Sequence, residues 1–145
     1  MARIVLTNVK VMFTDNTPAL VDISDHIASV TLTSTYDVVE TTAFSTDAVP
    51  LAAKTRQAGL VDNSVTFEFH QDFAASSIES TIYPMLGKIS AIELLPTDDA
   101  ASATNPEYQF NAVVSEWTPL NGAVGELSTA SVTWPITGKI VKVTS

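Results

Sequence analysis

Apolar and polar residues alternate along most of the chain, which is the pattern of β-strands with one buried face. In the segment 65–72 the residues Val65, Phe67 and Phe69 share one side, and polar residues occupy the positions between them. The same alternation continues in other segments, which we interpret as strands: 4–13, 29–44, 91–95, 107–114, 131–136 and 139–143. The pattern therefore predicts a mainly β protein of about seven or eight strands.

One segment follows the period of a helix instead. Its apolar residues lie four positions apart: Ile78, Ile82 and Leu86. Ser76 and Glu79 have the spacing of a capping box, and we expect Pro84 to kink or end the helix beside Tyr83 because proline has no amide hydrogen. Several short strands with one α-helix favour a β-sandwich or a partly open barrel, with the helix flanking one sheet.

A long inter-strand loop, at about residues 43–60, is the second exception to the alternation. Connections of more than about 12 to 15 residues are uncommon in compact domains and are usually functional or disordered. This loop carries the apolar residues Val49 and Leu51 together with Lys54 and Arg56, two of the seven basic residues of the chain. It is either an arm that becomes ordered on a partner or a flexible surface loop.

The composition is that of one folded domain spanning residues 1–145. Hydrophobic residues make up 46% of the sequence, which excludes disorder, and no apolar run approaches the roughly 20 residues of a membrane span. The alternating first segment is unlike a secretory signal, so we expect the protein to stay in the compartment where it is made. The absence of cysteine excludes disulfides, thiolate metal sites and cysteine nucleophiles.

Acidic residues outnumber basic residues by sixteen to seven, so the formal net charge is −9. Proteins that bind nucleic acid present basic surfaces to the phosphates, which is the opposite balance. The charge therefore indicates a protein that does not hold DNA, even where DNA passes close to it.

The residues suited to catalysis or metal binding are few and scattered. His26 stands beside Asp22 and Asp25 in a segment that we interpret as a polar turn. His70 lies on the polar side of a strand, where we expect an exposed histidine and not a metal ligand. The sequence contains no nucleophile motif, phosphate-binding loop, zinc-protease motif or calcium loop. We therefore predict no enzymatic activity, no metal and no cofactor.

The two tryptophans raise the alternative of a carbohydrate-binding β-sandwich, in which exposed aromatic rings stack on sugars. Trp134 alternates with Val132 and Ile136, so we expect it to pack in the core. Trp117 ends a strand and precedes a turn, and a place in the core or in an interface explains it better than a sugar platform.

Three longer segments occur in a distinctive order: DISDHIASVTLTSTYDVVETTAF (22–44), RQAGLVDNSVTFEFHQDF (56–73) and SEWTPLNGAVGELSTASVTWPITG (115–138). In this order, and over nearly the whole chain, the sequence resembles the major tail proteins, or tail tube proteins, of long-tailed bacteriophages of the siphovirus type. The resemblance implies a β-sandwich flanked by one helix. It also implies self-assembly into homo-hexameric rings that stack into a hollow tube.

The same resemblance implies a location and partners. The protein would belong to the virion, in the phage tail, and would assemble in the host cytoplasm with the tape-measure protein and other tail proteins. Genome DNA would pass through the lumen without specific binding. The long loop would reach a neighbouring subunit, which makes Val49, Leu51, Lys54 and Arg56 candidate inter-subunit residues.

A lumen would explain the composition of the segment 29–44. Thr31, Thr33, Thr35 and Asp37 stand at every second position of this segment. A strand with one face on the core and the other on a water-filled bore alternates apolar residues with hydroxyls and acids. Such a lining repels phosphates weakly and lets DNA slide. We therefore expect these four residues to face the lumen.

Two other classes of function remain open from the sequence. A virion adaptor, decoration or tail terminator protein would share the composition and fold class, but it would form one ring or none. A carbohydrate-binding module would belong to a different class and would use Trp117.

Overall fold

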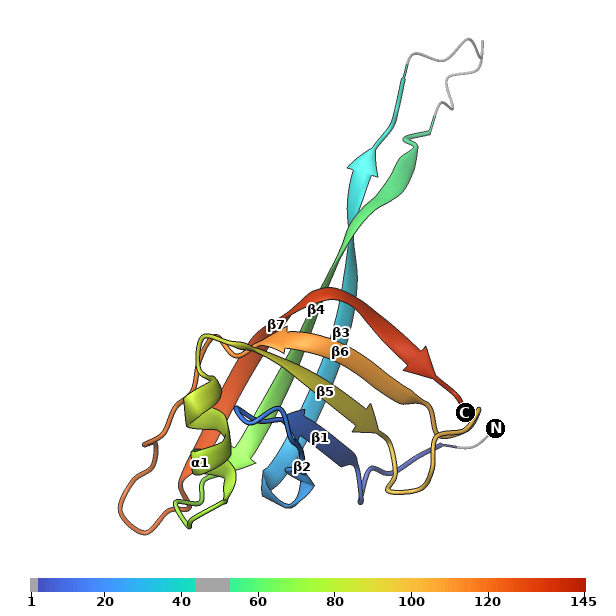
Figure 1. The fold of residues 1–145 in the computed structure, drawn as a ribbon. Coiled ribbons are helices and arrows are strands. Elements are labelled where there is room, and N and C mark those ends of the chain that lie inside the picture. The colour runs from blue at the N-terminus through green and yellow to red at the C-terminus, as the bar shows by residue number, and fades with distance from the viewer. Residues whose placement is uncertain (1–2, 44–52) are drawn as a thin grey trace.

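The computed structural model describes residues 3–43 and 53–145, which form one antiparallel sheet of seven strands in the order β2-β1-β5-β6-β7-β4-β3 (Figure 1). The strands are β1 (Lys10–Thr14), β2 (Leu20–Asp22), β3 (Ile27–Glu40), β4 (Arg56–His70), β5 (Ile89–Leu95), β6 (Glu107–Val113) and β7 (Thr129–Val143). The helical segments are the 3-10 helix η1 (Ser24–His26), the α-helix α1 (Ile78–Ile82) and the 3-10 helix η2 (Tyr83–Met85). The expected mainly β class with a single short α-helix is confirmed.

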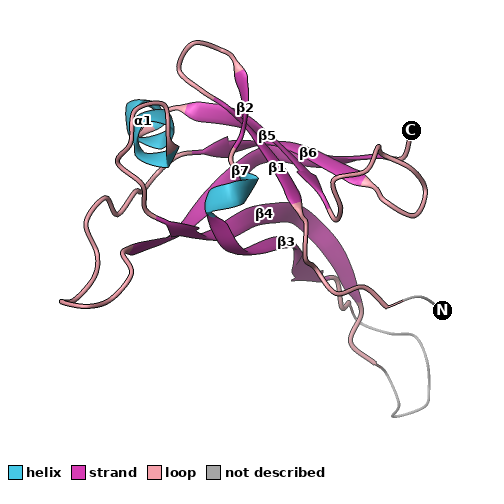
Figure 2. Cartoon of the chain, turned by 90° about the horizontal axis from the view of Figure 1, so that it is seen from below, coloured by secondary structure: helices cyan, strands magenta, loops and turns pink. Residues whose placement is uncertain are grey.

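The sheet curves so that one of its faces encloses the hydrophobic core. In Figure 2 the strands β1, β5 and β6 lie above β4 and β3, and the core residues come from both parts. Of the two architectures expected, the partly open barrel describes this single curved sheet. The helix α1 closes one end of the core, because Ile78 and Ile82 are both buried.

Trp134 lies at the centre of the core, as its alternation with apolar neighbours predicted. Its ring centroid is 5.9 Å from that of Phe13, 5.6 Å from that of Phe67 and 6.1 Å from that of Phe69. Its indole Nε1 donates a hydrogen bond of 2.8 Å to the backbone oxygen of Glu116. Because its buried indole N–H has an acceptor, Trp134 packs in the core without leaving a polar group unpaired.

The helix is shorter than the sequence pattern suggested, and its start differs. It ends at Ile82 and continues as η2 around Pro84, which confirms the expected break beside Tyr83. The capping-box prediction is wrong. Ser76 has a φ of 61° and lies outside the helix. The N-cap residue is Ser77, and no side chain makes a capping hydrogen bond there. No helix among the described residues is long and apolar enough to cross a membrane.

Several strand limits also differ from the expectation. The strand expected at 4–13 begins only at Lys10, and the short strand β2 was not foreseen. The two strands expected after residue 131 are one continuous strand, β7, which passes through Gly138 with a φ of 85°. Residues 56–60 were expected in the long loop, but they form the first part of β4 and pair with the end of β3.

Candidate functional site

A polar surface extends across β3, β4 and β7 on the side of the sheet opposite the core. Thr31 pairs in register with Thr66, and Thr66 pairs with Thr133, so three threonines cross the three strands in one row. The hydroxyls of Thr66 and Thr133 are 3.0 Å apart and share a hydrogen bond. On the other side of β3, Val30 and Leu32 pack against the core. The two faces of the sheet therefore differ sharply in polarity.

The rows on either side of the threonine row are polar as well, except at Pro135. Their cross-strand positions are Ser29, Glu68 and Ser131 in one row, Thr33, Ser64 and Pro135 in the next, and Thr35 and Asp62 beyond these. The four residues expected to share a side of β3 are all exposed: Thr31, Thr33, Thr35 and Asp37. We call these rows together the polar face.

An irregularity in the pairing of β3 and β4 marks the end of the polar face. Tyr36 pairs with Val61 and Val38 pairs with Ala58, so two residues of β4 lie opposite the single residue Asp37. Gly59 is one of the two. A Cβ atom there would lie 3.2 Å from Cγ2 of Val39 and 3.4 Å from Cβ of Asp37, which leaves little room for a side chain. The absence of a side chain at this position is thus a condition for the local geometry.

Beyond the irregularity, β3 and β4 leave the body of the protein as a two-stranded ribbon (Figure 1). We call its described residues, 36–43 and 53–61, the arm. The amide of Thr41 donates to the backbone oxygen of Thr55 at 2.8 Å, and the amide of Thr55 donates to Oγ1 of Thr42 at 2.9 Å. Four large apolar side chains of the arm are exposed, Tyr36, Val38, Val39 and Leu60, whereas Val61 at its base is half-buried. A ribbon of two strands is marginally stable in water by itself, and this one is anchored because its strands continue into the sheet.

The two basic residues proposed for inter-subunit contacts lie at the far end of the arm. The Nζ of Lys54 is 3.9 Å from Oε1 of Glu40, and Arg56 pairs in register with the same Glu40. Both cations therefore lie beside an acid of their own chain. The other two candidates, Val49 and Leu51, lie outside the described residues.

Two adjoining hollows open where the N-terminal segment crosses between β3 and the β1 and β5 strands. One is an apolar groove of about 410 Å³, whose walls include Val9, Val30, Leu32, Leu94, Tyr108 and Ile140. The other, of about 500 Å³, is lined by Asp22, Asp25 and Asp98 along with Lys10. Leu6, Val9 and Val30 line both hollows. We refer to the first as the apolar groove and to the second as its acidic end.

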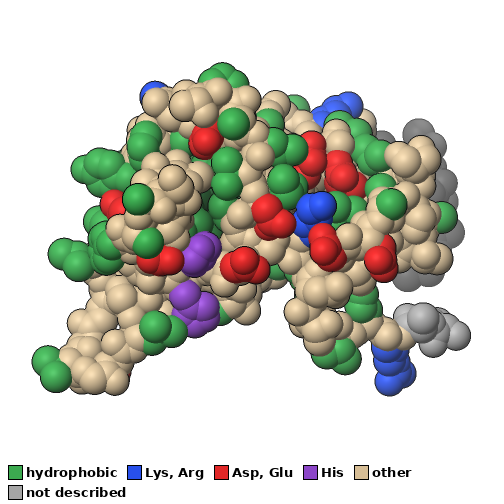
Figure 3. Space-filling model, turned by 60° about the horizontal axis from the view of Figure 1, so that its bottom comes forward, with side chains coloured by type: hydrophobic (Ala, Val, Ile, Leu, Met, Phe, Trp, Pro, Cys, Tyr) green, Lys and Arg blue, Asp and Glu red, His purple; other side chains and the backbone are tan. Residues whose placement is uncertain are grey.

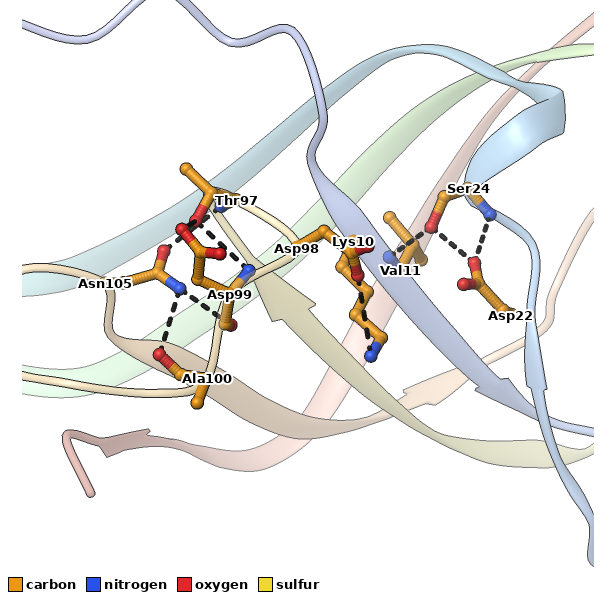
Figure 4. A network of polar contacts seen from close by, with 9 residues as sticks. All are labelled: Lys10, Val11, Asp22, Ser24, Thr97, Asp98, Asp99, Ala100 and Asn105. Carbon is orange, nitrogen blue, oxygen red and sulfur yellow. Dashed lines mark hydrogen bonds and ion pairs between the residues drawn. The ribbon is translucent and has the colours of Figure 1, made fainter.

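Hydrogen bonds hold the acidic end in shape (Figure 4). Ser24 Oγ accepts from the amide of Val11 at 2.8 Å, and Oδ1 of Asp22 accepts from the amide of Ser24 at 2.9 Å. Asp98 lies 3.6 Å from the Nζ of Lys10. Figure 3 brings this side forward and shows several acidic side chains grouped around one basic side chain. The surface there is acidic in spite of the one ion pair.

A buried asparagine fixes the turn that carries Asp98. Its Nδ2 donates to the backbone oxygen of Asp99 at 3.0 Å, and its Oδ1 accepts from the amide of Thr97 at 3.1 Å. This residue, Asn105, is 7% exposed. A buried side-chain amide with both ends satisfied is a rigid support, so the position of Asp98 is defined by the fold.

Among the residues that the structure describes, three carboxyl groups have shifted pKa values. Burial, followed by repulsion from Glu107, raises the pKa of Glu93, and nearby Lys10 opposes this shift. The pKa of Asp15 is lowered, first by the hydrogen bond from the Thr17 hydroxyl. The pKa of Asp72 is lowered, first by the hydrogen bond from the Ala74 amide. Asp15 and Asp72 each accept a hydrogen bond from a backbone amide two residues further along an exposed turn.

The remaining candidates from the sequence are two histidines and a tryptophan, and each lies against a neighbouring part of the fold. His26 ends η1, and its Nε2 lies 3.2 Å from the hydroxyl of Ser77. His70 was expected to be exposed, but it is half-buried and its Nδ1 is covered. Within residues 3–43 and 53–145, no three His, Cys, Asp or Glu residues group as metal ligands. Trp117 is 8% exposed and its Nε1 donates to Glu79 at 2.6 Å, so it offers no open platform for a sugar.

Sequence reasoning missed the apolar groove and the apolar residues of the arm. The groove is built from the N-terminal segment, β3, β5, β6 and β7, which are far apart in the chain. The arm did carry a signal, since Tyr36, Val38 and Val39 leave only one polar residue among four consecutive positions. This run continues beyond the alternation that marks a half-buried strand.

No protein-family model and no curated protein matches the sequence. The fold is similar to that of a chain in the virion of a native gene transfer agent particle, with a TM-score of 0.65 and 9% sequence identity over 92% of this chain and 95% of that chain. It is also similar to a chain in the cryo-EM structure of the anti-feeding prophage baseplate, 6-fold symmetrised, with a TM-score of 0.62 and 13% identity over 99% and 97%. At these identities the similarity concerns the fold.

Proposed function

We propose that this chain is a structural protein of a phage or phage-derived particle, and that it has no catalytic role. Its copies assemble into stacked, hexameric rings that form the tail tube of the virion. Two solved structures with this fold come from such particles, and their alignments span nearly the whole chain. The more specific proposal, a tail tube, is supported by the surfaces of the molecule.

The polar face is the observation that carries the proposal. It spans three strands, it is made almost entirely of hydroxyls and acids, and it lies opposite the core. A sheet needs such a face where it borders water on the inside of a wide, closed assembly. We place Thr31, Thr33, Thr35 and Asp37 on the lumen of the tube.

The charge of the molecule suits the passage of DNA. Duplex DNA carries one negative charge per about 1.7 Å, so a basic lining would bind it and slow its movement. Salt screens charges beyond about 10 Å at 0.1 M, so only residues on the wall near the DNA act on it. Asp37, Asp62 and Glu68 belong to the polar face or its border, and they would repel DNA weakly.

The edges of the sheet support closure into a ring. β3 is an edge strand of 14 residues, whereas the strand at the other edge, β2, has only 3 residues. A long uncovered edge invites uncontrolled pairing unless another chain covers it. Contacts of one flank of each copy with a different flank of the next are head-to-tail, and such contacts can close into a ring.

The partners follow from this role. Copies of the same chain are the main partner, and the tape-measure protein and other tail proteins complete the tail. Genome DNA passes through the lumen without specific binding. Assembly takes place in the host cytoplasm.

A ring protein of the tail end is the second candidate. The similarity to a chain of a baseplate favours it. An adaptor, decoration or terminator protein would use the same polar face and edge, but its copies would stop at one ring or none. The two candidates therefore differ in whether rings stack.

Electron microscopy of the purified protein at high concentration, with light scattering after gel filtration, tests the proposal. We expect tubes of uniform width with a hollow axis. Single rings would select the second candidate. A protein that stays monomeric at every concentration would contradict both.

A further inference from the structure

The loop between β6 and β7 contains an asparagine that is followed directly by a glycine, and both of these residues, Asn121 and Gly122, are exposed. We propose that Asn121 is a site of spontaneous deamidation. Its side-chain amide is lost, and the residue is converted to a mixture of aspartate and isoaspartate. This chemistry is independent of the proposed function, because it needs only the loop and water.

The reaction joins the backbone of Gly122 to the side chain of Asn121. The Gly122 nitrogen attacks Cγ of Asn121, a bond forms between these atoms, and the bond from Cγ to Nδ2 breaks. The proton of the Gly122 amide leaves with Nδ2 as ammonia, and a cyclic succinimide remains. Water then opens the ring at either carbonyl carbon, which gives aspartate or isoaspartate. No reactant other than water is consumed.

The structure leaves the reacting groups free. Within residues 3–43 and 53–145, neither the Gly122 amide nor the Asn121 side chain has a hydrogen-bond partner. An amide that donates a hydrogen bond has to break it before it attacks, and this cost is absent here. Glycine also has no side chain to hinder the approach, and it leaves the backbone free to rotate.

The other five asparagines of the chain lack this combination. Three of them are held within the fold or lack a nucleophile. Asn63 and Asn111 lie inside β4 and β6, where the backbone is paired with neighbouring strands. Asn105 precedes Pro106, whose nitrogen carries no proton to give up.

Asn16 and Asn8 are exposed, as Asn121 is, but the residues that follow them differ. The amide after Asn16 belongs to Thr17 and donates a hydrogen bond of 2.8 Å to Oδ1 of Asp15. Asn8 precedes Val9, whose β-branched side chain crowds the backbone nitrogen. Asn8 is therefore the internal comparison that isolates the effect of the glycine.

The loop is closed by an atom whose bonding the reaction changes. The backbone oxygen of Asn121 accepts from the Ser128 hydroxyl at 2.9 Å and from the Thr129 amide at 3.3 Å, so it holds the start of β7. In isoaspartate this oxygen belongs to a free carboxylate, and the peptide bond to Gly122 runs through the former side chain. The loop is then one carbon atom longer, and each modified copy carries one more negative charge than the −9 of the sequence.

Incubation of the purified protein at low concentration and mildly alkaline pH tests the proposal. Mass spectrometry of proteolytic peptides measures the loss of ammonia at each asparagine, and enzymatic methylation detects isoaspartate. The matched variant is Gly122→Ala, because a Cβ atom at this position would lie 3.6 Å from Cα of Ser128, which is an ordinary contact. A sample unfolded in guanidinium chloride is measured beside the folded protein, and circular dichroism checks that the variant folds.

We expect Asn121 to react before every other asparagine, and at a similar rate in the folded and the unfolded protein. Gly122→Ala should slow the reaction about tenfold or more, which corresponds to about 1.4 kcal/mol or more in the barrier. Reaction of Asn8 as fast as that of Asn121, or an unchanged rate in Gly122→Ala, would overturn the proposal. Much slower reaction of Asn121 in the folded protein than in the unfolded protein would show that the fold protects this site, and it would overturn the proposal as well.

The aged protein gives a second test, which concerns the closure of the loop. It separates from the fresh protein on an anion-exchange column because of its added negative charge. We expect the isoaspartate form to unfold at a lower temperature than the Asn121→Asp variant, which has the same charge on an unaltered backbone. Equal melting temperatures would contradict the part given to the Asn121 oxygen in holding the start of β7.

Discussion

Thr66 and Thr133 share a hydrogen bond of 3.0 Å between β4 and β7, on the face of the sheet turned away from the core. Thr31 continues the row onto the edge strand β3. The bond links hydroxyls on a surface where each could bind water equally well. The row thus shows how the sheet keeps an ordered polar surface across its three longest strands.

Replacing Thr133 by valine should cost little stability. The substitution keeps the branched shape and removes one hydrogen bond, so we expect a loss of about 0.5 to 1 kcal/mol in the free energy of unfolding. Thr31→Val is the control, because no hydrogen bond of its hydroxyl occurs among the described residues. Urea unfolding of both variants measures the difference. A larger loss for Thr31→Val would contradict the assignment of the bond.

Trp134 should be the most sensitive position of the core. Trp134→Ala removes a fully buried side chain and its contacts with three phenylalanines, so we expect a loss of about 3 to 5 kcal/mol. Trp134→Phe should lose about 1 to 3 kcal/mol, because it leaves the backbone oxygen of Glu116 without its donor. Thermal and urea unfolding give both values, and a Trp134→Phe variant as stable as the wild-type protein would show that the indole bond contributes nothing.

Glu79 should link the helix to the loop after β6. Its Oε2 accepts from Nε1 of Trp117 at 2.6 Å and from Nε2 of Gln71 at 3.2 Å. Glu79→Ala should therefore cost about 2 kcal/mol, since hydrogen bonds to a charged group are strong. Glu79→Gln keeps an acceptor oxygen and should cost less. Urea unfolding followed by tryptophan fluorescence measures both, and an unchanged Glu79→Ala variant would remove this residue from the account.

Glu93 should make the protein less stable at neutral pH. Its folded pKa is raised above the ordinary value of 4.5, so the folded state binds the proton more tightly than the unfolded chain does. Stability is then lost as the pH rises from 4.5 through the raised pKa. Glu93→Gln should raise the melting temperature at pH 7, with no gain below about pH 4. Glu126→Gln, in an exposed loop, is the control. A gain independent of pH would contradict the explanation.

Alternation along the sequence was enough to assign the faces of the long strands. Val65, Phe67 and Phe69 are all buried, and Thr31 and Thr33 are exposed, as the period of two predicted. This works because one side of each strand borders the core and the other borders water. The contrast in polarity along the chain records that difference directly.

Alternation could not reveal which segments find a partner strand. Residues 4–9 were expected to begin the first strand, yet they lie outside any strand, where Leu6 and Val9 border the two hollows. Residues 56–60 show no alternation, yet they are paired because the long strand β3 continues beside them. Glu79 was expected to form a capping box with Ser76, but its carboxylate accepts a hydrogen bond from Trp117, which lies 38 positions away. These outcomes depend on tertiary neighbours that no local pattern contains.

The central claim is that copies of the chain enclose a bore lined by the polar face, and size-selective labelling of assembled protein tests it most directly. The chain has no cysteine, so Thr33→Cys places one thiol on the polar face and Ser80→Cys places one on the exposed side of α1. In intact assemblies, we expect Thr33→Cys to react with a small maleimide and to be protected from a maleimide on a large polymer. Ser80→Cys should react with both reagents. Equal reaction of Thr33→Cys with the large and the small reagent would place the polar face on the outside and contradict the claim.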